Sequence, residues 1–335
     1  MFWHINKFLY QSKYDESDIN MQYFLFNAED NNSMLNKNFK SKYGISVKQY
    51  LDFWRSLLIK NEDVNLESTA ETILKCWTIE HQNVKTGIQQ YSNGINNNFY
   101  KTFIPEFFLE YPIILFRGKH YCIDHNVLKR TVHEFLFSFA LKSKEVKGNF
   151  DKRFQDYISK TLDELKIAYK NDGELKKEGE LECDFLISEF LFAECKAVKL
   201  KPFAQVNPND DTLKINLEKI IYAYKQIIAT VNRFPNVTQS YFGVIITYLP
   251  FYFSDGTDIW EIIKSEIENF LNEKGYDLLV KPENLFFVDI KSWKQLINVL
   301  KKRGNNILIE IFLTAKLKNR TEPKFEFLMH LKDFM

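Results

Sequence analysis

Charged residues lie inside two apolar runs between residues 179 and 197, and this stretch most constrains how the chain can fold. It reads GELECDFLISEFLFAECKA. Asp184, Glu194 and Lys196 sit among residues that would otherwise form two buried strands. Charged side chains avoid protein interiors unless they are paired or bind a metal ion. The stretch therefore predicts either a built polar site or a solvated hairpin face.

The alternation of side chains predicts the register of this hairpin. Successive side chains of a strand point to opposite faces of the sheet. With residues 188–190 as the loop, Ile187 pairs with Leu191 and Phe185 pairs with Ala193. The four apolar residues of these pairs then fall on one face, which is the pattern that normally selects the register. Continued by one more pair, the same register sets Cys183 against Cys195, although reduced thiols are expected in a cytosolic chain.

This register places Asp184 directly opposite Glu194, on the face that also carries Lys196. Directly opposed residues have Cβ atoms about 4.5–5.5 Å apart, and like charges there repel each other. A hard divalent cation would relieve the repulsion, because Mg²⁺ is typically held by one or two carboxylates together with water and phosphate oxygens. The alternative is a solvated outer face. Leu186 and Phe192 share the charged face, however, and favour its partial burial.

The pattern Asp184-x9-Glu194-Cys195-Lys196 resembles the D-x(n)-E-x-K core of the PD-(D/E)XK, or restriction-endonuclease-like, nuclease superfamily. The resemblance covers roughly residues 148–289, and Cys183 stands where the nominal motif has a proline. It implies an α/β fold with a mixed central sheet flanked by helices. It also implies metal-dependent hydrolysis of phosphodiester bonds, and hence an enzyme of the hydrolase class.

The resemblance assigns a role to each residue of the motif. Asp184 and Glu194 would hold Mg²⁺ or Mn²⁺, with the backbone carbonyl of Cys195 as a further ligand. Lys196 would orient or activate the attacking water and stabilise developing negative charge, unless it only forms an ion pair with the carboxylates. Gln155 stands where many members carry another acid on the first core helix, and it could still bind a water of the metal. Whether one or two ions bind stays open.

Three further residues are candidates for binding nucleic acid. Lys225 and Gln226, on an expected helix over residues 214–234, resemble a glutamine-containing element of several nuclease branches. Lys199 follows the second strand of the hairpin and could contact a phosphate backbone. A solvated polar helix face is the alternative for this pair of helix residues.

The expected substrate is DNA, with RNA as an alternative. Nuclease domains that follow an unfamiliar N-terminal module resemble effectors of bacterial restriction and anti-phage defence. A catalytically silent subunit with the same fold, which binds nucleic acid or a partner protein, is the competing hypothesis. Gln155 in place of an acid favours that hypothesis, whereas the intact Asp184, Glu194 and Lys196 argue against it.

The order of the expected elements divides the chain into two parts. Residues 1–145 read as a helix-rich module, with helices at 46–60, 68–84 and 125–143 and a hairpin at 111–124. This module could mediate a homodimer or bind a partner protein. Residues 146–335 read as the nuclease-like domain, in the order helix, charged hairpin, helix, strand, helix, strand, helix. That order suits a mixed sheet flanked by helices. Its expected segments are 149–169, 214–234, 240–253, 256–275 and 284–303, with an ambiguous tail from residue 304.

Composition narrows the class of protein further. The formal net charge is +1, so any surface that binds nucleic acid must be local. With 11 glycines in 335 residues and no glycine-rich phosphate loop, ATP-driven chemistry is not expected. The first residues lack the apolar core of a signal peptide, and no apolar run approaches the ~20 residues that span a membrane. We therefore expect a cytoplasmic protein with no membrane contact.

Overall fold

The computed structural model describes residues 16–59, 67–86, 108, 111–123, 125–199, 210–234, 240–322, 324 and 326–335. The chain divides into two compact units, Met1–Arg153 and Phe154–Met335. Helix α10 (Lys144–Glu164) runs across this division. The boundary expected between residues 145 and 146 therefore falls within the same helix.

The first unit is built mainly from helices. In its described residues they are α2 (Glu16–Leu25), α3 (Met34–Tyr43), α4 (Val47–Ile59), α5 (Glu67–Trp77), α9 (His125–Ala140) and the start of α10. Aromatic rings fill the core between α4, α5 and α9; the Trp54 and Trp77 rings, for example, stack with centroids 4.7 Å apart. Such ring pairs contribute about 0.5–1.5 kcal/mol beyond their burial.

A three-stranded sheet, in the order β1-β2-β3, completes the described part of this unit. Strands β2 (Ile113–Phe116) and β3 (Lys119–Cys122) form the expected hairpin around Arg117 and Gly118, which confirms that prediction. The helix expected over residues 68–84 ends early, at Trp77. The next residues form β1 (Thr78–Glu80), which pairs in parallel with β2, and this pairing competes successfully with the helix.

The second unit has a five-stranded mixed sheet in the order β4-β5-β6-β7-β8. The strands are β4 (Tyr169–Asn171), β5 (Phe185–Ile187), β6 (Leu191–Lys196), β7 (Phe242–Thr247) and β8 (Leu285–Asp289). The pairs β4–β5 and β5–β6 are antiparallel, whereas β6–β7 and β7–β8 are parallel. This confirms the expected mixed α/β architecture with a mixed sheet.

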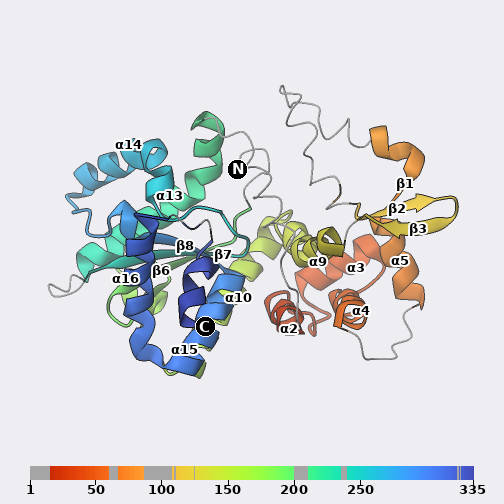
Figure 1. Cartoon of the computed structure of the whole chain (residues 1–335), viewed down its shortest axis with the longest axis horizontal. Helices are drawn as coiled ribbons and strands as arrows, with labels where there is room; N and C mark the ends of the chain where they lie inside the picture. The colour runs from red at the N-terminus through yellow and green to blue at the C-terminus, as the bar shows by residue number, and fades with distance from the viewer. Residues whose placement is uncertain are drawn as a thin grey trace. The chain divides into compact units, whose positions relative to one another are not determined.

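Helices cover both faces of this sheet (Figure 1). Helices α13 (Asp210–Arg233) and α14 (Thr257–Lys274) pack on one face, where Ile245 and Phe287 belong to their shared apolar core. Other side chains of the same strands point to the opposite face. There the Phe242 and Phe286 rings contact Phe312 of α16 (Leu308–Asn319). Helix α15 (Ile290–Arg303) binds α10 on that side, through a hydrogen bond from Trp293 Nε1 to Thr161.

Other differences from the expected elements are local. Helix α10 begins at Lys144 rather than near residue 149, because the Ser143 hydroxyl accepts a hydrogen bond from the Val146 N–H and caps it. Strand β4 was not expected. The ambiguous tail is helical, as α16 and α17 (Leu328–Leu331). The remaining short elements are α11 (Asp172–Leu175) and the 3₁₀ turns His81–Asn83, Pro282–Asn284, Asn305–Ile307 and Lys332–Phe334.

The charged hairpin has the predicted register. Ile187 pairs with Leu191 and Phe185 pairs with Ala193, so the three-residue loop is confirmed. The ladder then stops, and the expected pairing of Cys183 with Cys195 is wrong. The Cys183 N–H instead donates to the Thr230 hydroxyl of α13 at 2.8 Å, so it does not continue the ladder with β6. Both cysteines are buried free thiols.

The loop of this hairpin holds two residues other than glycine in the left-handed region. Ser188 has φ 49° and Glu189 has φ 64°. The Phe190 N–H donates to the Ile187 carbonyl at 3.3 Å and closes the turn. A left-handed conformation costs an L-residue roughly 1–2 kcal/mol, and turns of this kind prefer Asn-Gly. The hairpin is therefore held by its register and burial rather than by favourable turn residues.

This strain predicts a stabilising substitution. Glu189 is exposed, so Glu189→Gly should remove the strain of the positive φ without disturbing packing. Part of this gain in stability is lost because glycine makes the unfolded chain more flexible. We expect a net gain of about 0.5–1 kcal/mol in the free energy of unfolding by urea titration. Glu189→Ala removes the same carboxylate but keeps Cβ, and it should give no gain. Equal effects of the two substitutions would contradict the strain.

Candidate functional site

Three charged residues of the hairpin converge at the carboxyl end of the central strand β6. Asp184 and Glu194 have only 7% and 2% of their surface exposed, so the solvated-face alternative does not hold for them. Leu186 and Phe192, on the same face, are buried as expected. In α/β sheets, ligands bind outside the carboxyl ends of the parallel strands, which is where β6 presents Lys196.

Two hydrogen bonds between the neighbouring segments fix the carboxylates side by side. The Asp184 N–H donates to Glu194 Oε2 at 3.0 Å, and the Cys195 N–H donates to Asp184 Oδ2 at 2.6 Å. The Gln155 amide of α10 donates to Asp184 Oδ1 at 2.6 Å. Hydrogen bonds to ionised acceptors are stronger than neutral ones. These bonds therefore hold in place two like charges that would otherwise separate.

Lys196 brings positive charge to the pair. Its Nζ forms an ion pair with Glu194 Oε1 and donates to Gln226 Oε1 at 2.8 Å. The Gln226 amide in turn donates to the Glu182 carbonyl at 2.7 Å, so the lysine is held between β6 and α13. The Tyr222 ring centroid lies 5.4 Å from Nζ. The ion pair given above as the alternative role for Lys196 is thus present.

Burial sets the electrostatics of the site. Burial raises the pKa of Asp184 to about 6 despite the Cys195 N–H and the charge of Lys196. Burial, followed by repulsion from Asp184, raises the pKa of Glu194 to about 8. Burial lowers the pKa of Lys196, but attraction by Glu194 and Asp184 outweighs it and leaves that pKa above its ordinary value. The two carboxylates are therefore incompletely compensated by the protein alone.

This donor set fits a hard divalent cation. Each carboxylate oxygen accepts one hydrogen bond in the structure and has a second lone pair for another partner. Across the described ranges, no three His, Cys, Asp or Glu side chains gather as a metal-binding group. The chain would thus supply Asp184, Glu194 and a backbone carbonyl such as that of Cys195. Mg²⁺ is typically held by one or two carboxylates, with water as its other ligands.

One stripe of α13 supports the site and was largely missed from the sequence. Tyr222, Gln226 and Thr230 recur every four residues and so lie on one face of the helix. They contact Lys196, the Glu182 carbonyl and the Cys183 N–H, respectively. The four-residue spacing of these polar and aromatic side chains was the signal that could have identified Tyr222 and Thr230 along with Gln226.

The other two nucleic-acid candidates lie differently. Lys225 directs its Nζ over the Phe270 ring of α14, 5.7 Å from the centroid, so it does not join the cluster around Gln226. Lys199 is partly buried and lies three residues beyond the end of β6. A third carboxylate, Asp172 at the start of α11, was not foreseen; its charge contributes to raising the pKa of Asp184.

The raised pKa values predict how the metal-free protein responds to pH. The unfolded chain releases these carboxyl protons near pH 4, whereas the folded site keeps them to about pH 6 and about pH 8. The folded state then binds more protons in this window, so its contribution to stability is lost as pH rises. Asp184→Asn removes one acid and its repulsion on the other. The asparagine oxygen can still accept from the Cys195 N–H, and its amino group can donate to Gln155 once the Gln155 amide turns its oxygen towards it.

We therefore expect Asp184→Asn to flatten the fall in stability between pH 5 and pH 8. The free energy of unfolding is measured by urea titration with EDTA present. The difference between the variant and wild type should grow in the variant's favour by at least about 1 kcal/mol from pH 5 to pH 8. Parallel curves for the two proteins would show that Asp184 does not titrate as described.

Comparisons with family models, with curated proteins and with solved structures found no match for this chain. In the parts of the chain that are described, no helix combines the length and apolar character needed to cross a membrane. Functional inference therefore depends on the geometry of the site itself.

Proposed function

We propose that residues 154–335 form a restriction-endonuclease-like domain that hydrolyses phosphodiester bonds with Mg²⁺ or Mn²⁺. The observation that carries this proposal is the buried pair of Asp184 and Glu194, with the Lys196 ammonium beside it at the end of β6. Buried charges are costly, and a cluster of this kind, with shifted pKa values, is typical of functional sites. A purely structural ion pair needs one carboxylate, not two.

Each residue has a distinct role in this proposal. Asp184 and Glu194 hold the ion, and Gln155 orients Asp184 through its hydrogen bond. When bound, the ion supplies Lewis-acid chemistry: it neutralises the phosphodiester and lowers the pKa of water. Lys196 lies at hydrogen-bond distance from Glu194 and stabilises negative charge that develops on the phosphate oxygens. Gln226 holds the Lys196 ammonium in position.

The proposed substrate is DNA, with RNA as the alternative. The Tyr222 side chain is 49% exposed although it lies beside Lys196, so its ring can contact a sugar or base next to the cleaved phosphate. Lys199 is a further candidate for backbone contact. A role in restriction or anti-phage defence, in the cytoplasm, follows only from the family resemblance and is part of the proposal.

A second candidate function has one specific observation in its favour. Gln155 donates to Asp184 Oδ1, a bond that an acid at this position would make only in its protonated form. The amide therefore reduces the negative charge available for a second ion. A catalytically silent subunit that binds nucleic acid or a partner protein would show this feature.

Cleavage of supercoiled plasmid and of labelled RNA tests the proposal. Wild type should cleave in Mg²⁺ or Mn²⁺ and not in EDTA. Asp184→Asn and Lys196→Ala should each lose on the order of 100-fold or more in rate. Lys196→Arg should also be poor, because a planar guanidinium does not replace a compact ammonium.

The matched control is Glu189→Gln, which removes one carboxylate from the exposed tip of the same hairpin. It should cleave at the wild-type rate. Full cleavage by Lys196→Ala would exclude the catalytic role of Lys196. Binding of DNA in Ca²⁺ without cleavage by wild type in any metal would instead favour the silent subunit.

A further inference from the structure

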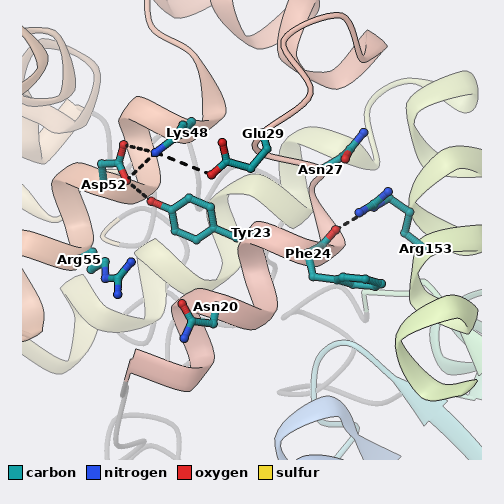
Figure 2. Close-up of a pocket in the computed structure, with 9 residues that line it drawn as sticks. All are labelled: Asn20, Tyr23, Phe24, Asn27, Glu29, Lys48, Asp52, Arg55 and Arg153. Atoms are coloured by element: carbon teal, nitrogen blue, oxygen red, sulfur yellow. Dashed lines mark hydrogen bonds and ion pairs between the residues drawn. The ribbon is translucent and has the colours of Figure 1, made fainter. Parts of the chain in front are cut away.

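The first unit contains a polar pocket that the proposed nuclease site does not use (Figure 2). Its volume is about 470 Å³, within the range of small-molecule sites. It is lined by Asn20, Tyr23, Phe24, Asn27, Glu29, Lys48, Asp52, Arg55 and Arg153. Eight of these nine side chains are polar or charged, so the space is not a gap in an apolar core.

On the wall formed by Tyr23, Lys48 and Asp52, the charged groups are paired with each other. The Tyr23 hydroxyl donates to Asp52, and Lys48 Nζ pairs with Asp52 Oδ2 at 3.0 Å. Burial, with the hydrogen bond to Asp52, holds the pKa of Tyr23 far above its ordinary value, so Tyr23 stays a neutral donor. Lys48 also lies 3.7 Å from Glu29. At the rim, Arg55 is paired with Glu16 at 2.5 Å.

Arg153 differs from the other two cations. Its Nε donates to the Phe24 carbonyl at 2.7 Å, and its guanidinium carbon lies 4.9 Å from the Phe24 ring centroid. These contacts fix the guanidinium near the end of α2. Arg153 lies at the right of Figure 2, across the pocket from Lys48 and Asp52 at the left. Among the residues that the structure describes, Arg153 has no carboxylate partner. Its two terminal amino groups can therefore donate two parallel hydrogen bonds to one carboxylate or phosphate group.

We propose that this pocket binds a small organic anion, whose phosphate or carboxylate group is held by Arg153. Positive charge is uncompensated at the Arg153 end, whereas acceptors of Asp52 and Glu29 lie at the other end. The ligand should therefore be a small polar molecule with one anionic group and hydrogen-bond donors elsewhere. Asn20 and Asn27 offer amide groups to such a molecule. This proposal does not depend on the nuclease proposal, because all lining residues belong to the first unit.

A purely structural role for Arg153 is the competing explanation, since Nε alone caps a carbonyl at the end of α2. Arg153→Gln separates the two roles. Glutamine places an amide nitrogen where arginine has Nε, so it can still donate to the Phe24 carbonyl, but it lacks the charge and the fork. Arg117→Gln is the matched control, because Arg117 is exposed on the β2–β3 turn of the same unit and does not line the pocket.

Calorimetric titration of the full chain tests the proposal, with inorganic phosphate and AMP for the phosphate arm and citrate for the carboxylate arm. Sodium chloride at matched ionic strength controls for general screening. At least one probe should bind with one-to-one stoichiometry. Arg153→Gln should weaken that binding at least tenfold while keeping the wild-type melting temperature, and Arg117→Gln should leave it unchanged.

A second substitution keeps the test decisive if Arg153→Gln does not fold. Asn20 is exposed, so Asn20→Asp should fold, and its added negative charge in the pocket should weaken binding of the anion. Binding in one arm alone would identify the anionic group of the ligand. Binding in neither arm, or equal binding by wild type and these variants, would overturn the proposal.

Discussion

The second unit is arranged around two carboxyl groups that are buried side by side, those of Asp184 and Glu194. Asp184 and Glu194 each accept a hydrogen bond from a backbone N–H of the facing segment, and these two bonds cross between β6 and the residues before β5. Without them, repulsion in a medium of low dielectric constant would separate the two groups whenever both are ionised. When both groups are ionised, the hairpin carries two negative charges against the one positive charge of Lys196.

The elements around the hairpin serve this arrangement. Helix α13 holds the segment before β5 through Thr230 on the Cys183 N–H, Gln226 on the Glu182 carbonyl and Arg233 on the Leu181 carbonyl at 2.7 Å. The side chains of α13 thus take the place of a neighbouring strand for that segment. They bond to backbone groups that would otherwise be buried without partners. Helix α10 reaches the same place from another direction through Gln155. The same helix carries Arg153, which lines the pocket of the first unit.

Much of the charged hairpin could be predicted, because side chains alternate between the two faces of a strand and this pattern is visible within a few residues. The loop length followed from keeping Phe185 and Ile187 on the same face as Leu191 and Ala193. Leu186 and Phe192 indicated that the opposite, charged face is partly buried as well. The end of the ladder could not be predicted in this way. It depends on Thr230, which lies 47 residues beyond Cys183. Neither residue alone carries a signal for that contact.

Two other features were beyond the reach of local patterns. Strand β4 has three residues, of which two are exposed, so it shows no alternation that could be recognised. Helix α16 contains β-branched and aromatic residues that favour strands as readily as helices; packing of Phe312 on Phe242 and Phe286 decides its form. The lining of the polar pocket comes from residues as far apart as Asn20 and Arg153, so only the fold reveals it.

The central claim is that the buried carboxylate pair holds a divalent cation. The most direct test is titration with Mn²⁺, in which electron paramagnetic resonance measures the free ion without any need for turnover. Wild type should bind at least one Mn²⁺ per chain, and Mg²⁺ should displace it. Glu194→Gln should lose that ion while remaining folded, whereas Glu189→Gln should keep it. Equal binding by wild type and Glu194→Gln, or no binding by wild type, would contradict the account.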